Sequence, residues 1–261
     1  MRLAVISDIH GNFTALEAVL ADLEAKGGSD HLWFLGDLAA FGPRPAECIR
    51  RIKALADAAS EGEKKGTFRA IHGNTDRYIT RGARPKSKGV DKAEDLPDMI
   101  NSFRSMSSSL IWALDQLSFE EYDFLRKLPG ECDLHVPGYG QVIGYHGIPG
   151  DDEGYLKPDT PDEEAADALL DREGRLGIGG HIHVQMDRML NVGGWRVVNV
   201  GAVGMSFEKP GIAQYGVFTF ENGDVQVDLR GVPYDVESVI AELETVGYPV
   251  PEWAAKNFRR N

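Results

Sequence analysis

Five short apolar segments of the chain each end in a polar cluster, and this repeated pairing limits the fold more than any other feature. They have the length and composition of buried strands and lie at residues 3–6, 32–35, 68–71, 142–145 and 176–178. The carboxyl ends of the strands in an α/β sheet gather at one edge, where ligands bind. We therefore expect the five clusters to meet at that edge, although they are scattered over most of the chain.

The clusters carry side chains that bind metal ions. In chain order they are Asp8-Ile9-His10, Gly36-Asp37, Gly73-Asn74-Thr75-Asp76, His146-Gly147 and Gly180-His181-Ile182-His183. A single Asp or Asn at such a place is more often a helix cap or a turn residue than a ligand. Four of the 7 histidines of the chain stand here together with carboxylates, and this favours a metal site.

Helical patterns separate the first strands. Apolar residues recur at helical spacing in residues 13–25 and again after the second strand. This alternation indicates a largely parallel sheet with helices outside. The second half is expected to be more antiparallel, with a hairpin in residues 133–145 and a helix at 162–171, followed by strands near 187–190, 195–200, 215–220 and 225–229 and by helices from about 236 and at 253–260.

The alternation of strand and helix stops between Asp76 and Glu131. Helices are expected there at residues 96–115 and 119–128, the second of which ends at Pro129-Gly130. We interpret this part as a helical insertion at about residues 77–130, over one edge of the site. The prediction is one domain that spans residues 1–261.

The start of this insertion is basic in an acidic chain, whose formal net charge is −13. This segment contains one acidic residue, Asp91, and six basic residues: Arg77, Arg81, Arg84, Lys86, Lys88 and Lys92. This basic arm (residues 77–92) is either a solvated surface loop or a segment that reaches an anionic substrate through Arg77 and Arg81. The acidic balance argues against a protein that wraps duplex DNA.

Other features of the chain point to the cytoplasm. No segment approaches the roughly 20 apolar residues of a membrane span, and the first strand begins without a signal-peptide pattern. We expect Cys48 and Cys132 to be free thiols. The sequence leaves open whether the chain forms a homo-oligomer.

The five clusters resemble the motifs of the calcineurin-like metallophosphoesterases, which read D-x-H, G-D, G-N-H-[DE], H and G-H-x-H in the same order. Residues 145–149 and 198–204 look like the small bacterial and archaeal branch often labelled YfcE-like. The resemblance implies a four-layer α-β-β-α sandwich of two mixed sheets with outer helices. It also implies two divalent metal ions, Mn most readily, with Fe, Zn, Ni or Co as alternatives.

The family's ligands can be carried over to matching residues. One ion would be held by Asp8, His10, Asp37 and His183, and the other by Asp37, Asn74, His146 and His181. Asp37 would bridge the ions, and a hydroxide between them would attack phosphorus. The residues expected to serve catalysis directly are Asp37, Asn74, Thr75 and Asp76, and those expected to line the substrate site are Asn12, Arg77, Arg81 and Gly201. Asn12 and Asp76 could instead orient ligands, and Gly201 could belong to a turn.

Thr75 departs from the family pattern, because a histidine usually stands at this position. A threonine hydroxyl cannot act as a general acid at neutral pH, so we expect good leaving groups such as aryl or nucleotide phosphates to be favoured. The sequence predicts a phosphoesterase that acts on small phosphodiesters or nucleotides. The alternatives are a weakly active or inactive metal- or nucleotide-binding regulatory protein, or a protein phosphatase.

Overall fold

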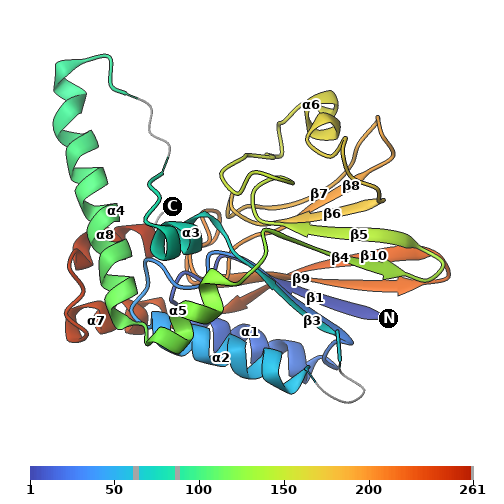
Figure 1. Ribbon diagram of the computed structural model, residues 1–261, viewed down its shortest axis with the longest axis horizontal. Coiled ribbons are helices and arrows are strands. Elements are labelled where there is room, and N and C mark those ends of the chain that lie inside the picture. The colour runs from blue at the N-terminus through green and yellow to red at the C-terminus, as the bar shows by residue number, and fades with distance from the viewer. Residues whose placement is uncertain (61–64, 86–88, 260–261) are drawn as a thin grey trace.

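The chain folds into two five-stranded sheets packed face to face (Figure 1). The computed structural model describes residues 1–60, 65–85 and 89–259, so that Lys86 and Lys88 of the basic arm lie outside the described residues. The first sheet has the order β10-β9-β1-β2-β3 and consists of β1 (Arg2–Ile6), β2 (His31–Leu35), β3 (Phe68–Ile71), β9 (Ile212–Glu221) and β10 (Asp224–Pro233).

The second sheet has the order β4-β5-β6-β8-β7 and consists of β4 (Glu131–Val136), β5 (Gly140–Tyr145), β6 (Leu176–Gly179), β7 (Gln185–Met189) and β8 (Arg196–Val200). Each sheet contains three neighbouring parallel strands, β1-β2-β3 in the first and β5-β6-β8 in the second. The remaining strands pair antiparallel. Both sheets are therefore mixed, as predicted.

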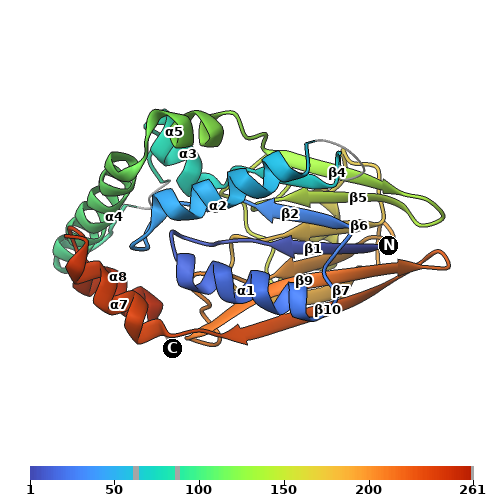
Figure 2. The same ribbon diagram turned by 90° about the horizontal axis from the view of Figure 1, so that it is seen from below.

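Helices α1 (Phe13–Ala25) and α2 (Pro45–Ala58) cover the outer face of the first sheet (Figure 2). The short α6 (Asp162–Asp167) lies on the outer side of the second sheet (Figure 1). The other helices gather at the end of the molecule opposite the N-terminus: α3 (Asn74–Arg81), the 3₁₀ turn η2 (Ala93–Asp95), α4 (Leu96–Gln116), α5 (Phe119–Arg126), α7 (Val236–Thr245) and α8 (Pro251–Phe258).

Strand β1 shows how the layers are held together. Its side chains alternate between the two faces of the sheet, so that Ala4 and Ile6 pack with α1 while Leu3 and Val5 pack between the sheets with Trp33. These four side chains are fully buried. A third apolar cluster lies outside the second sheet and a fourth joins α7 to α8. The predicted four-layer sandwich is confirmed.

The sequence did not assign β9 and β10 to a sheet, and the structure places both in the first sheet, because β9 pairs with β1. The structure differs from the sequence prediction in two places. The predicted helix at 162–171 is shorter and ends at Asp167. The first part of the basic arm is the helix α3 instead of a loop, since the Asp76 carboxylate accepts the N–H of Gly73 at its start and Gly82 ends it with a φ of 64°.

Cys48 and Cys132 are both buried free thiols, as expected. Within the described residues, no helix combines the length and apolar character that a membrane crossing needs.

Candidate metal centre

The polar clusters that follow five strands meet at the end of the molecule that faces α3 and α8 (Figure 1). Each predicted ligand stands directly after β1, β2, β3, β5 or β6, where a parallel strand ends. Two compact groups result, Asp8-His10-His183 and Asp37-His146-His181. Within each group the candidate ligand atoms lie within 4.8 Å of one another. The predicted convergence of the clusters is confirmed.

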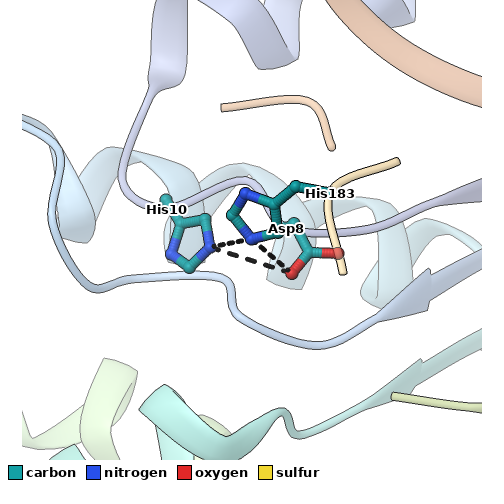
Figure 3. Close-up of side chains that lie close together, drawn as sticks. All are labelled: Asp8, His10 and His183. Carbon is teal, nitrogen blue, oxygen red and sulfur yellow. Dashed lines mark hydrogen bonds and ion pairs between the residues drawn. The ribbon is translucent and has the colours of Figure 1, made fainter. Parts of the chain in front are cut away.

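The first group directs two imidazoles and one carboxylate at a common point (Figure 3). Nε2 of His10 lies 3.1 Å from Nε2 of His183, which lies 3.2 Å from Oδ1 of Asp8. All three residues are buried. Among the described residues, Oδ1 of Asp8 accepts no hydrogen bond. A buried carboxylate oxygen without a hydrogen bond destabilises the folded protein unless a cation or another donor binds it.

The second group has the same chemistry with an added amide. Nε2 of His146 lies 3.4 Å from Oδ2 of Asp37 and 3.1 Å from Oδ1 of Asn74. Nε2 of His181 is buried and makes no hydrogen bond within the described part of the chain. This nitrogen is therefore available as a ligand.

Asp37 lies between the two groups. Its Oδ2 is 3.4 Å from Nε2 of His146 in one group and 3.7 Å from Nε2 of His10 in the other. One carboxylate oxygen thus faces both sets of imidazoles. The bridging role predicted for Asp37 is compatible with this position.

Hydrogen bonds behind the ligands fix which atoms point inward. Nδ1–H of His146 donates to the Leu35 carbonyl at 2.7 Å, and Nδ1–H of His183 donates to the Met205 carbonyl at 2.6 Å. An imidazole bonded in this way presents Nε2 as its ligand atom.

The carboxylates are held similarly from behind. Oδ2 of Asp8 accepts the backbone N–H of His181 at 2.9 Å. Oδ1 of Asp37 accepts the backbone N–H of Thr75 at 2.9 Å. Each carboxylate therefore has one oxygen bound to the backbone and the other turned toward the centre.

The backbone at these residues is strained. Seven non-glycine residues of the described chain have positive φ, and five are predicted ligands: Asp8 (56°), His10 (50°), Asp37 (54°), His181 (70°) and His183 (57°). Such conformations cost about 1–3 kcal/mol each and persist only where surrounding contacts impose them. They cluster here because the ligands must turn inward directly at the strand ends.

The electrostatics of the groups favour cations. Burial alone would raise the pKa of Asp8, but His183 and His146 outweigh burial and lower it to about 2. Burial lowers the pKa values of His10 and His181 to about 4, so both rings are neutral at pH 7. Burial also lowers the pKa of His146, but Asp37 beside it raises that pKa to about 10. Ionised carboxylates, the neutral rings of His10 and His181 and the cationic ring of His146 therefore line one buried space in the metal-free protein.

These observations fit a divalent metal site. The unsatisfied buried atoms, the mixed oxygen and nitrogen donors and the absence of both cysteines from the groups suit borderline or hard divalent ions. The structure brings together all seven residues that the sequence proposed as ligands: Asp8, His10, Asp37, Asn74, His146, His181 and His183.

Asp76 and Asn12 brace the loops around the centre. The Asp76 carboxylate accepts the backbone N–H groups of Leu38 at 3.0 Å and Gly73 at 3.1 Å, and burial together with Asp37 raises its pKa to about 7. Asn12 caps α1 and donates to the Gly204 carbonyl at 3.1 Å. These contacts favour the orienting role over direct contact with substrate.

The other predicted substrate residues are exposed or already engaged in hydrogen bonds. Arg77 donates to Asp152 and to Glu153, each at 2.7 Å, and Arg81 is exposed. The N–H of Gly201 donates to Oδ1 of Asn199 in a turn where φ is 77°. Substrate contact by Arg77, Arg81 or Gly201 therefore stays a prediction.

An aromatic wall beside the centre was not predicted from the sequence. A cavity of about 800 Å³ is lined by ligand residues together with Phe41, Tyr155, Phe207 and Trp253. Phe41 stands close to Asp37 in the sequence, and this proximity was a usable signal. Trp253 is remote in the sequence from every motif, so no such signal pointed to it.

If ions bind here, changing Asp37 should affect both groups at once. We expect Asp37→Asn to weaken binding of two Mn²⁺ ions roughly tenfold or more, since its Oδ2 faces both groups, whereas His10→Ala should mainly weaken one. Calorimetric titration of Mn²⁺ and elemental analysis measure this, with the exposed His135→Ala as the histidine control. Full metal content in Asp37→Asn would contradict a shared role for Asp37.

Asp76 should contribute to stability even without metal. Asp76→Ala leaves buried N–H groups of Leu38 and Gly73 without their acceptor, so we expect a loss of about 3 kcal/mol in the free energy of unfolding of the metal-free protein. Urea titration measures the change, and Asp98→Ala in the exposed first turn of α4 is the control. Equal stability of the two variants would refute the bracing role.

Comparison with known proteins shows which family this chain belongs to. The model of the calcineurin-like phosphoesterase superfamily domain matches residues 1–223. An uncharacterised protein of Methanocaldococcus jannaschii is 27% identical over 271 aligned positions, which cover 98% of this chain and 96% of that protein.

A crystal structure of a metallophosphoesterase from Sphaerobacter thermophilus superposes with a TM-score of 0.72 and 25% identity, and the match covers 99% of this chain and 98% of that one. A symmetrical bis(5'-nucleosyl)-tetraphosphatase of Vibrio campbellii is 29% identical over 123 positions, 47% of this chain and 42% of that protein. The resemblance seen in the motifs is confirmed: the chain belongs to the calcineurin-like phosphoesterase superfamily.

Proposed function

We propose that this phosphoesterase uses two divalent ions to hydrolyse phosphodiester or nucleotide-type phosphate bonds in a small substrate. The observation that carries the proposal is the pair of adjoining ligand groups with Asp37 between them. Mn²⁺ is the ion we propose first, with Fe, Zn, Ni and Co as alternatives, because all accept carboxylate and imidazole ligands.

The ions and the residues of the chain would have different roles in the reaction. Two bound divalent ions supply positive charge to the phosphate oxygens and activate water for attack on phosphorus. The carboxylates of Asp8 and Asp37 and the amide of Asn74 would hold the ions, with one oxygen of each carboxylate fixed by a backbone N–H. That prior fixation reduces the reorganisation needed during reaction.

Two features support a diester or nucleotide substrate. The cavity of about 800 Å³ beside the ligands has room for much more than a phosphate group. Thr75 lines that cavity, and its buried hydroxyl makes no hydrogen bond among the described residues, so this residue offers no acid for a poor leaving group. The partial similarity to a bis(5'-nucleosyl)-tetraphosphatase points to the same class of substrate.

A regulatory protein that binds metal or nucleotide without turnover is the second candidate. The departure at Thr75 motivates it, whereas the complete and strained ligand set supports an enzyme. Hydrolysis separates the two candidates.

The test is hydrolysis of bis-p-nitrophenyl phosphate by the purified protein with Mn²⁺, after removal of metal with a chelator, and after Mn²⁺ is restored. We expect activity with Mn²⁺, at least a hundredfold loss on chelation, and recovery on addition of the ion. Asp37→Asn serves as the matched variant. Tight Mn²⁺ binding without any turnover of a diester or nucleotide panel would favour the regulatory protein.

Thr75 should make the rate sensitive to the leaving group. Without an acid at this position, we expect wild-type rates to fall steeply as the pKa of the leaving alcohol rises. Thr75→His should flatten this dependence and speed up poor leaving groups by up to roughly 10²-fold. A series of aryl and alkyl phosphodiesters measures both slopes.

Thr75→Val is the control for this series, because it keeps the shape of the side chain and removes a hydroxyl that makes no hydrogen bond among the described residues. It should leave the slope unchanged. A shallow wild-type slope would mean that another group donates the proton. Tyr78 is a poor candidate for that group, since burial and its hydrogen bond to Glu153 raise its pKa well above the usual range.

A further inference from the structure

The cavity beside the candidate metal centre has an aromatic side that no metal ligand explains. Its volume is about 800 Å³, and His10, Asp37 and Asn74 lie at its polar side. Phe41, Phe207 and Trp253 line it as well. These three aromatic residues, called the ring wall below, come from segments far apart in the sequence.

Two of the rings stack directly on metal-ligand candidates. The Phe41 ring lies 5.4 Å from the His10 ring, with 29° between their planes. The Phe207 ring lies 4.3 Å from the His183 ring, at 27°. The ring wall therefore starts at the ligands, within reach of any group joined to a phosphate bound there.

Phe41 is held in this place by a strained backbone. Its φ is 85°, a conformation that is rare for a bulky side chain. Among the described non-glycine residues with positive φ, Phe41 joins the five candidate ligands and Asn222. Strain of this kind persists where surrounding structure imposes it, and it gathers at functional sites.

Helix α8 extends the ring wall away from the ligands. Trp253 meets Phe41 edge to face, with 5.6 Å between ring centres and 70° between planes. Asn257 stands one helical turn after Trp253 and lines the same cavity. Ala254 and Phe258, on another side of α8, are buried against α7 and anchor the helix.

This part of the cavity lies outside the matched superfamily domain, which ends at residue 223. The chain thus adds a flat indole and an amide to a site whose metal ligands belong to the common domain. Trp253 is only half-buried, so one part of its surface remains available to a ligand.

We propose that the ring wall binds a flat aromatic ring joined to the phosphate of the substrate, with Trp253 as the main contact. This inference rests on the proposed phosphoesterase function and adds a binding determinant to it. A nucleobase and a simple aryl group share this chemistry, because both offer a planar π face to an aromatic side chain. The Asn257 amide can in addition hydrogen bond to the edge of a nucleobase.

The test compares ligands that differ only beyond the phosphate. Calorimetry with the Mn²⁺-loaded protein measures the affinities of adenosine 5'-monophosphate, ribose 5-phosphate and phenyl phosphate. We expect adenosine 5'-monophosphate to bind at least tenfold more tightly than ribose 5-phosphate, which lacks the base. Phenyl phosphate binding as tightly as the nucleotide assigns the wall to aryl groups in general, whereas weak binding of phenyl phosphate assigns it to nucleobases.

Variants assign the preference to Trp253. Trp253→Leu should reduce the difference between the nucleotide and ribose 5-phosphate to less than about threefold, while Trp253→Phe, which keeps a flat ring, should retain most of it. Trp112→Leu is the control, because Trp112 packs edge to face on Tyr248 at 4.7 Å among the same helices. It tests whether loosening these helices is enough to lose the preference, and we expect the preference to survive.

Two outcomes would overturn the inference. One is equal affinity of the wild-type protein for all three ligands, and the other is an undiminished nucleotide preference in Trp253→Leu. Because binding is measured, hydrolysis of bis-p-nitrophenyl phosphate stands as a separate result. Absent hydrolysis with a Trp253-dependent preference would refute the phosphoesterase proposal alone, and normal hydrolysis without a preference would refute the ring wall alone.

Discussion

The burial of two ionised carboxylates at one point is the constraint on which the rest of this structure depends. Asp8 is fully buried and Asp37 is 3% exposed, yet both keep pKa values below the usual range. Such a pair is stable only if opposite charge and hydrogen-bond donors surround it. The cationic ring of His146 and two backbone N–H groups provide part of this, and the oxygen of Asp8 that accepts no hydrogen bond from described residues marks what a cation would add.

The two sheets place these groups together through the direction of their parallel strands. The loops that follow β2 and β3 then approach so closely that a side chain would not fit between them. Gly36 has a φ of 89°, and a Cβ there would lie 2.4 Å from the backbone nitrogen of Gly73. This contact brings Asp37 under the N–H of Thr75. The backbone strain at the ligands is thus offset by the packing of the strands and loops, which imposes these conformations.

The sequence predicted the parts of this arrangement that local patterns determine. The strand ends, helix α1 and the ligand residues can each be recognised from residues a few positions apart. The common edge at which parallel strands end then brings the ligands together. Contacts between segments that are distant in the sequence could not be predicted from such local patterns. The ion pairs of Arg77 could not be read from the sequence, because its partners Asp152 and Glu153 lie some 75 positions away. The pairing of β9 with β1 and the placement of Trp253 are likewise tertiary outcomes, fixed by packing that no neighbouring residue reveals.

An acidic protein that acts on phosphate esters must obtain affinity for anions from a limited source. Its net charge is −13, and Arg77, the first cation of the basic arm, is occupied by two acidic side chains. Bound divalent ions would then carry most of the attraction for the phosphate. A wall of uncharged rings adds affinity without attracting other anions, because apolar and stacking contacts do not depend on charge. Under the proposed function, the metal centre recognises the phosphate and the ring wall selects the group attached to it, so that the two tasks fall to different parts of one cavity.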